Sequence, residues 1–177
     1  MPKGIFPRKV REVISVIGPS IAYIPLTRGQ FSLIDSADSE LLGTWNWAAY
    51  YDPSIGNYYA TRSQQIDKPH QDQIRMHRLL LGIRGKVKGD HANRNPLDNR
   101  RSNLRVATDS QNGANKAYRC NRSGYKGVSW NRFHQKYRVQ IKKDNRVFHL
   151  GYVDDPKDGH AIYCAKALEL HGEFAKV

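Results

Sequence analysis

The segment "KGDHANRNPLDNRRSNLRVATDSQNGANK", residues 88–116, gathers polar side chains that could bind a metal ion and move a proton. It contains six Asn, three Asp and one His. Asp90 offers a hard anionic oxygen and Asn112 a neutral amide oxygen, and two such ligands with water and a substrate phosphate suit Mg²⁺. His91 could take a proton from water. A metal ion here would polarise a phosphate, so the residue types favour metal-assisted hydrolysis of a phosphodiester.

Local signals predict the elements that must position these groups. Residues 85–91 read as a short strand ending at Asp90 and His91, residues 92–103 as a long polar turn, and residues 104–108 as a second strand. Thr108, with Gln111 three residues on, has the spacing of a helix-capping box, which puts Asn112 about one turn into a helix. In the turn, Asn103 could hydrogen-bond the backbone and so aim His91. The alternative is an Asn-rich loop stabilised only by its own side chains.

The stretch "MHRLLLG…GDHANRNPLDNRRSNLRVATDSQNGANK" resembles the HNH endonuclease family, specifically its homing-type and phage members, over about residues 74–117. The resemblance implies a ββα-metal motif with one Mg²⁺ or Mn²⁺ ion. It implies His91 as general base, Asp90 and Asn112 as metal ligands, and Asn103 as the orienting residue. The last position is Asn instead of the His that names the family, as is usual in the homing-type branch.

The charge favours a polyanionic partner. The 177 residues carry a net charge of +13, and residues 115–150 hold ten Lys and Arg against one Asp. Such clustering indicates nucleic acid, here double-stranded DNA, more than a merely basic surface that aids solubility. Predicted phosphate contacts near the polar segment are His77, Arg78, Arg100, Arg101 and Arg105.

Residues 123–177 read as a separate module of three strands and one helix. In "KYRVQIKK", residues 136–143, Tyr137, Val139 and Ile141 alternate with polar residues. "DN" at 144–145 predicts a hairpin turn, and the next strand is expected to turn Phe148, Leu150 and Tyr152 inward. The helix is predicted to begin after an Asp155 cap with Pro156 at its first position, and to pack through Ile162, Ala165 and Leu168. The other sheet face is the predicted DNA-binding surface, carrying Trp130, Arg132, Arg138, Gln140 and Lys142.

This module resembles the APETALA/ethylene-response-factor type of DNA-binding domain. "YKGVSW", "YRVQI", "HLGYV" and "ALELHGEFA" follow that domain's order along about residues 123–175. Tyr137 stands where that family often has Trp. The resemblance implies a DNA-targeting arm joined to the nuclease motif.

The N-terminal region reads as short strands over residues 11–18 and 22–35, helical turns over 38–42, and a hairpin around residues 52–57. Trp45, Trp47, Tyr50 and Tyr51 could stack bases, but alternating aromatics in a small sheet favour a core.

Together these patterns predict an α+β protein. A strand-rich N-terminal region with the ββα-metal motif, residues 1–117, precedes a three-stranded antiparallel sheet packed on one helix, residues 123–177, with a linker near 116–123. The expected activity is DNA endonuclease; the alternatives are a non-catalytic DNA-binding regulator and an RNA-directed protein. No small-molecule cofactor, signal peptide or membrane contact is expected, which fits the cytoplasm of a bacterial or phage-infected cell. The sequence leaves open whether the chain is a monomer or a dimer.

Overall fold

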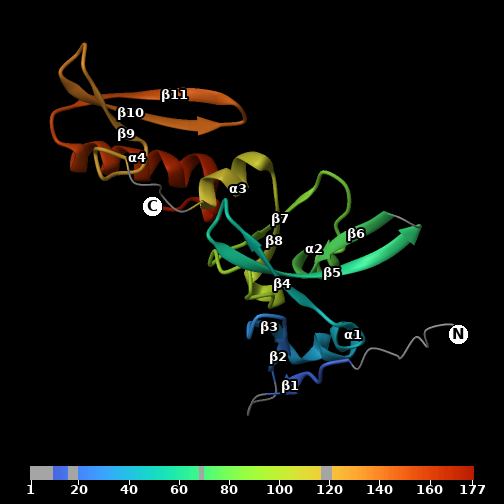
Figure 1. Cartoon of the computed structure of the whole chain (residues 1–177). Coiled ribbons are helices and arrows are strands. Elements are labelled where there is room, and N and C mark those ends of the chain that lie inside the picture. The colour runs from blue at the N-terminus through green and yellow to red at the C-terminus, as the bar shows by residue number, and fades with distance from the viewer. Residues whose placement is uncertain (1–9, 16–19, 68–69, 117–120) are drawn as a thin grey trace, which may run out of the picture. The chain divides into compact units, whose positions relative to one another are not determined.

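A computed structural model of the chain shows two compact units, residues 1–105 and 106–177. The structure describes residues 10–15, 20–67, 70–116 and 121–177 (Figure 1). Both units combine small sheets with short helices, so the predicted α+β class is confirmed. Among the described residues, every helix is too short or too polar to cross a bilayer. The division at residues 117–123 stays a prediction, and most of its linker lies outside the described residues.

The first unit begins with a three-stranded antiparallel sheet in the order β1 (Ile14–Ser15), β2 (Ile21–Pro25), β3 (Phe31–Asp35). The rest of the first predicted strand, residues 16–18, lies outside the described residues. A short 3₁₀ turn, Ser36–Asp38, and α1 (Ser39–Gly43) follow, as the sequence predicted. A second antiparallel sheet consists of β4 (Ala48–Asp52), β5 (Asn57–Asp67) and β6 (His70–Arg75).

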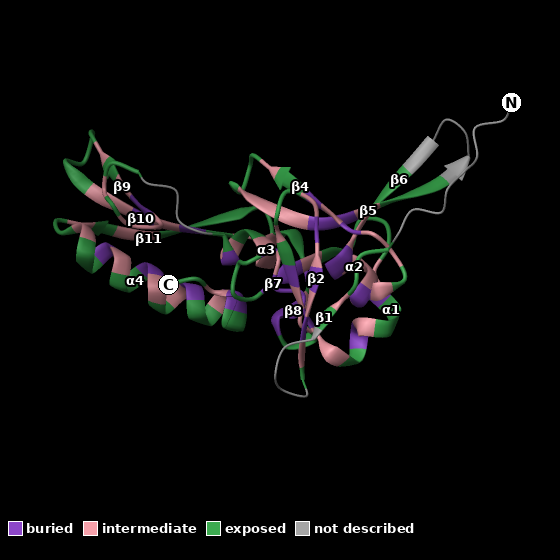
Figure 2. Cartoon of the chain, turned by 60° about the horizontal axis from the view of Figure 1, so that its bottom comes forward, coloured by how far each residue is buried: buried purple, intermediate pink, exposed green. Residues whose placement is uncertain are grey.

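After α2 (Met76–Leu80), the strands β7 (Lys88–His91) and β8 (Leu104–Ala107) form a two-stranded sheet. One apolar cluster joins both larger sheets to α1 and α2 (Figure 2). Its buried members are Ala22, Ile24, Leu26, Ile34, Leu42, Trp47, Ala49, Ala60, Met76, Leu80 and Leu104. Elements from residue 22 to residue 104 therefore share one core.

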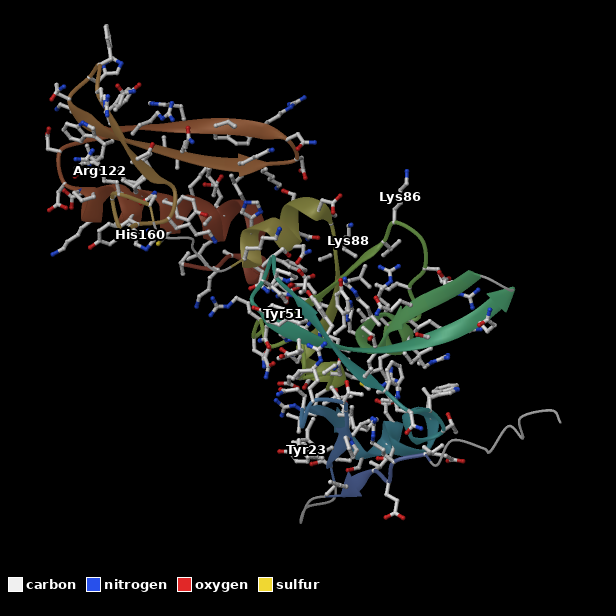
Figure 3. The ribbon with its side chains drawn as sticks, in the orientation of Figure 1. Tyr23, Tyr51, Lys86, Lys88, Arg122 and His160 are labelled. Atoms are coloured by element: carbon white, nitrogen blue, oxygen red, sulfur yellow. The ribbon has the colours of Figure 1, made fainter. Side chains whose placement is uncertain are left out.

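The predicted aromatic core is only partly correct. Trp47 is buried, its Nε1–H donates to the Leu42 carbonyl over 2.9 Å, and Trp45 packs against the same cluster. Tyr50 and Tyr51, however, are 42% and 43% exposed. Both belong to the edge strand β4 and directly precede its hairpin turn; Tyr51 is labelled in Figure 3.

The second unit contains α3 (Asp109–Asn115), the antiparallel strands β9 (Val128–Asn131), β10 (Lys136–Lys143) and β11 (Arg146–Val153), and α4 (Pro156–His171). A 3₁₀ turn, Gly172–Phe174, follows α4. The central strand is β10, and α4 packs on the sheet (Figure 1). Asp155 caps α4 by accepting from the Lys157 amide over 2.8 Å.

One residue of β11 changes which side chains face the core. Val139 pairs with Gly151 and the next residue, Gln140, with His149, so Leu150 is an extra residue in the strand. An extra residue reverses the alternation beyond it. The predicted inward direction is therefore right for Leu150, which packs against the core, and wrong for Tyr152, which pairs with Arg138 on the other face. Phe148 pairs with buried Ile141 but remains 38% exposed.

The packing face of α4 also differs from the prediction. Ile162 and Leu168 are 39% and 54% exposed, and Ala165 is exposed as well. The buried positions are Gly159, Tyr163, Ala167 and His171, spaced four apart. A Cβ atom on Gly159 would lie 3.0 Å from Val139 Cγ2, and one on Gly127 would lie 2.0 Å from the Tyr163 ring. The helix and the sheet therefore approach each other closely at these two glycines, and this contact determines which face of α4 is buried. A stripe of apolar residues in the sequence does not indicate that face.

Candidate active site

Asp90 and His91 are the last two residues of β7, and both are buried. Gly89 precedes them because a Cβ atom there would lie 2.7 Å from His77 Cδ2 and 3.0 Å from a methyl group of Leu81. The glycine therefore allows α2 and the residues after it to approach β7 closely. This places the His77 ring against the end of the strand.

The polar turn after His91 has a defined shape held by its own asparagines. Asn103 is buried; its Oδ1 accepts from the Asn93 amide over 2.9 Å, and its Nδ2 donates to the Asp98 carbonyl over 2.7 Å. Its carbonyl accepts from the Ala92 amide over 2.9 Å. Asn103 thus ties the beginning of the turn to its end. The catalytic importance predicted for Asn103 stays a prediction.

His91 is held by a side chain that the sequence did not single out. Its Nε2 lies 3.3 Å from Asn99 Oδ1, and Asn99 Nδ2 donates to Ser32 Oγ over 2.8 Å. Because the amide group of Asn99 donates to Ser32, its oxygen faces His91. This network assigns the proton to Nε2 and leaves the lone pair of the neutral ring on Nδ1.

Burial keeps the His91 ring neutral. It lowers the pKa of His91, and the hydrogen bond to Asn99 and the charge of Asp90 only partly oppose this effect. The His77 ring meets His91 edge-on, with centroids 4.9 Å apart, and Tyr59 lies 5.6 Å from His77 and 6.2 Å from His91. Burial and the neighbouring His91 lower the pKa of His77 to about 3. Two neutral imidazoles therefore stand side by side at pH 7.

Asp90 is the one predicted metal ligand in the first unit. Its side chain is 7% exposed, and Oδ2 accepts from Arg105 Nε over 2.9 Å. The described residues contain no cluster of three or more His, Cys, Asp or Glu side chains that could cage a metal ion. One carboxylate beside a substrate phosphate suits Mg²⁺, which usually keeps several waters. The donor set therefore fits an open site.

Asn112 lies in α3, in the second unit, and its part in metal binding stays a prediction. The helix begins as predicted: Thr108 Oγ1 accepts from the Gln111 amide over 3.1 Å, and Gln111 Oε1 accepts from the Thr108 amide over 2.8 Å.

The arginines predicted to contact phosphate near this site already have protein partners. Arg105 pairs with Asp90, Arg100 with Asp98 over 2.7 Å, and Arg101 with Asp38 over 2.7 Å. The guanidinium group of Arg78 donates to the Val87 and Gly85 carbonyls over 2.6 and 2.9 Å. These contacts fix loops and helices of the first unit. DNA contacts by these arginines and by buried His77 stay predictions.

On the second unit, Arg138, Gln140 and Lys142 share one face of the β9–β11 sheet, opposite buried Val139 and Ile141, and their contacts with DNA stay predictions. Trp130 does not share it. Trp130 pairs directly with Tyr137, with ring centroids 4.9 Å apart, and directly opposed residues lie on one face. Trp130 therefore lies on the same face of the sheet as Val139, which is the face that packs against α4. Arg132 follows β9, in the turn to β10.

Acid should destabilise the protein through its buried histidines. The unfolded chain binds a proton at His77 below about pH 6.5, whereas the folded protein does so only near pH 3. Stability should therefore fall as pH decreases between these values, by about 1.4 kcal/mol per pH unit for His77, with His91 acting in the same direction. Denaturant unfolding at pH 7 and pH 5 measures this, and His77→Gln should remove the His77 part. Equal pH dependence in both proteins would contradict the assignment.

Comparisons with known proteins give one family and two relatives. Residues 85–114 match the HNH endonuclease family model. An HNH endonuclease of Acanthamoeba polyphaga mimivirus, described as uncharacterised, is 33% identical over 109 residues, which cover 58% of this chain and 56% of that protein. Protein 3.8 of Escherichia phage T7 is 33% identical over 88 residues, 49% of this chain and 72% of that protein.

The chain thus spans about half the length of the mimivirus relative and most of the phage relative. No solved structure matches. The family match falls on the segment that holds Asp90, His91, Asn103 and Asn112. The chain therefore belongs to the family of phage T7 Protein 3.8, and its residues 85–114 carry the HNH endonuclease motif.

Proposed function

We propose that the chain is a metal-dependent DNA endonuclease of the homing or phage type that hydrolyses phosphodiester bonds. His91 is the general base, Asp90 and Asn112 are metal ligands, and Asn103 keeps the turn after His91 in place. The substrate is double-stranded DNA. The observation that carries this proposal is the buried, neutral His91, whose Nε2 is hydrogen-bonded to Asn99 beside the Asp90 carboxylate.

The geometry of His91 suits proton abstraction from water. A base must be unprotonated at the working pH, and the lowered pKa of His91 meets that condition. With the proton on Nε2, Nδ1 is the nitrogen that accepts a proton, and Asn99 Oδ1 stabilises the resulting imidazolium. A bound Mg²⁺ or Mn²⁺ would polarise the phosphate and stabilise the leaving oxygen. Asp90 would hold that ion.

Residues 123–177 supply DNA affinity in this proposal. Their three-stranded sheet on one helix has the element order expected of an APETALA/ethylene-response-factor type domain. The neighbouring charge supports this role, because residues 115–150 carry ten Lys and Arg and one Asp. Near the candidate site, Arg100, Arg101 and Arg105 are each paired with an aspartate, which favours the second unit as the source of positive charge for DNA.

The alternative is a non-catalytic DNA-binding regulator built on the same scaffold. Incubation of the protein with supercoiled plasmid separates the two functions. Nicked or linear product that forms with Mg²⁺ or Mn²⁺, and not with EDTA, supports the endonuclease. If the protein retards the migration of the plasmid in a gel but does not cleave it over a range of metals and pH, the regulator is supported. A parallel assay with a single-stranded RNA substrate tests the remaining alternative, a protein that binds or cleaves RNA.

Removal of two cations from the polar sheet face should weaken salt-dependent DNA binding. Each Lys or Arg that contacts phosphate contributes about 1 to the slope of log affinity against log salt concentration. Arg138→Ala with Lys142→Ala should therefore lower that slope by roughly 2. Fluorescence anisotropy with a labelled duplex over a salt series measures it, in EDTA to prevent cleavage. Lys157→Ala, an exposed cation on α4, is the matched control, and an unchanged slope in the double variant would remove this face from the DNA interface.

A further inference from the structure

The turn between β9 and β10 presents an unusually exposed aromatic ring. Phe133 is 89% exposed, whereas the next most exposed large apolar side chain of the described residues, Val147, is 59% exposed. The turn lies at one end of the sheet in the second unit (Figure 1). An isolated exposed apolar residue is ordinary in a protein surface. The surroundings of Phe133 are what distinguish it.

The backbone that carries Phe133 is fixed by side-chain hydrogen bonds. Asn131 Oδ1 accepts from the amides of both Phe133 and His134, each over 3.0 Å. Gln135 closes the turn with a φ of 51°, and its Nε2 donates to the Arg132 carbonyl over 2.7 Å. The ring is therefore presented to solvent by an ordered turn. A contact made from such a turn costs little conformational entropy.

Further rings continue from Phe133 over the polar face of the sheet. The centroids of Phe133 and His134 are 5.0 Å apart, those of His134 and Tyr152 4.3 Å, and those of Tyr152 and His149 4.7 Å. Tyr152 pairs with Arg138 across the strands. Phe133 thus stands at the end of a row of rings that runs along the proposed DNA-binding face.

A positive charge stands next to the tip, because Arg132 precedes Phe133 in the same turn. Arg132 also lines, with Arg122, Trp130 and Tyr137, a hollow of about 260 Å³, and Trp130 and Tyr137 belong to the other face of the sheet; Arg122 is labelled in Figure 3. Among the described residues, neither Arg122 nor Arg132 forms an ion pair with a carboxylate, in contrast to Arg100 and Arg101 of the first unit. An exposed apolar ring next to Arg132, which forms no ion pair with a carboxylate of the described residues, fits a ligand that is anionic outside and apolar inside. Stacked DNA bases within two phosphate backbones have that structure.

We infer that Phe133 is a wedge that inserts between stacked base pairs of double-stranded DNA while Arg132, the preceding residue, contacts a phosphate. This inference rests on the proposal that the second unit binds DNA. Apolar side chains inserted in this way partly unstack a base step and kink the duplex. Insertion also unwinds the helix locally, which closed circular DNA records as a change in linking number.

The test uses the full-length His91→Ala protein in EDTA, so that DNA cleavage does not interfere. A closed plasmid is relaxed by a metal-independent type I topoisomerase in the presence of saturating protein, and the linking number is read after the protein is removed. We expect a change in linking number that grows with bound protein. Phe133→Ala should abolish it and weaken duplex affinity by roughly 5- to 150-fold, the range for losing one aromatic–base stack. The salt slope should not change, because no charge is removed.

Two further variants make the test specific. Phe133→Leu keeps an apolar wedge and should retain most of the unwinding. Leu168→Ala, which removes an exposed apolar side chain of α4 and leaves the polar sheet face intact, should behave like the parent protein. An unchanged linking number with the parent protein, or equal unwinding by Phe133→Ala, overturns the inference. Loss of affinity without loss of unwinding also overturns it, because Phe133 would then contact DNA without inserting. Because the assay contains no cleavage step, a failed nuclease assay leaves this result unaffected.

Discussion

A His91→Ala variant should cut supercoiled plasmid about 10²–10⁴-fold more slowly than the wild type, the range that a general base usually contributes. The variant lacks the only group assigned to take the proton from water. His91 packs against His77 with their ring centroids 4.9 Å apart, so the variant also leaves a small gap. Single-turnover nicking at saturating protein and metal measures the chemical step, and far-ultraviolet circular dichroism checks the fold.

The pH profile sharpens this prediction. Burial lowers the pKa of His91, so wild-type activity should rise with pH below about 6.5 and be level at neutral pH. Activity lost on protonation of His91 should therefore return only when the pH rises above the lowered pKa. Asn93 is exposed and lies in the same polar turn, so Asn93→Ala is a control for a general disturbance of that turn. Unchanged nicking by a folded His91→Ala protein would remove His91 from the mechanism.

An Asn99→Ala variant should lose roughly 10- to 100-fold in nicking rate, although Asn99 does not itself take the proton from water. This is the usual cost of removing a side chain that orients a metal-ligating histidine, and we expect a similar cost for a histidine that acts as a base. Without the Asn99 oxygen 3.3 Å from Nε2, the His91 ring can turn, and its proton can occupy either nitrogen. Ser32→Ala, one hydrogen bond farther from His91, should cost less.

Substitution by aspartate distinguishes positioning from a general structural effect. Asn99→Asp keeps an acceptor for His91 Nε2, and Ser32 can donate to the new carboxylate. The added negative charge should raise the pKa of His91, so the acidic limb of the pH–rate profile should move to higher pH while the rate on its plateau recovers. A merely structural role for Asn99 predicts parallel losses in Asn99→Ala and Asn99→Asp with no shift of the profile. That result would contradict the positioning role.

The elements around the site could be predicted because their signals are local. The Thr108–Gln111 capping box, the Asp155 cap and the Asp144–Asn145 turn each depend on residues at most three positions apart. Both residues of that turn have positive φ, 47° and 65°, which Asp and Asn tolerate better than most residues. The end of β7 at Asp90 and His91 followed from the same kind of short-range signal.

Contacts between distant segments could not be predicted. Six asparagines lie in residues 88–116, and only packing against β3 shows that Asn99 meets His91, because its partner Ser32 is 67 residues away. Arg101 looked like a free cation but pairs with Asp38, 63 residues away. The face of α4 depends on close approach at Gly159 and Gly127, and the direction of Tyr152 on one extra residue in β11. The sequence by itself determined the order of elements and the reactive residue types, since short-range hydrogen bonds and hydrophobic periodicity encode them. Only the tertiary structure decided which polar groups are paired, because that depends on which distant side chains share a buried space.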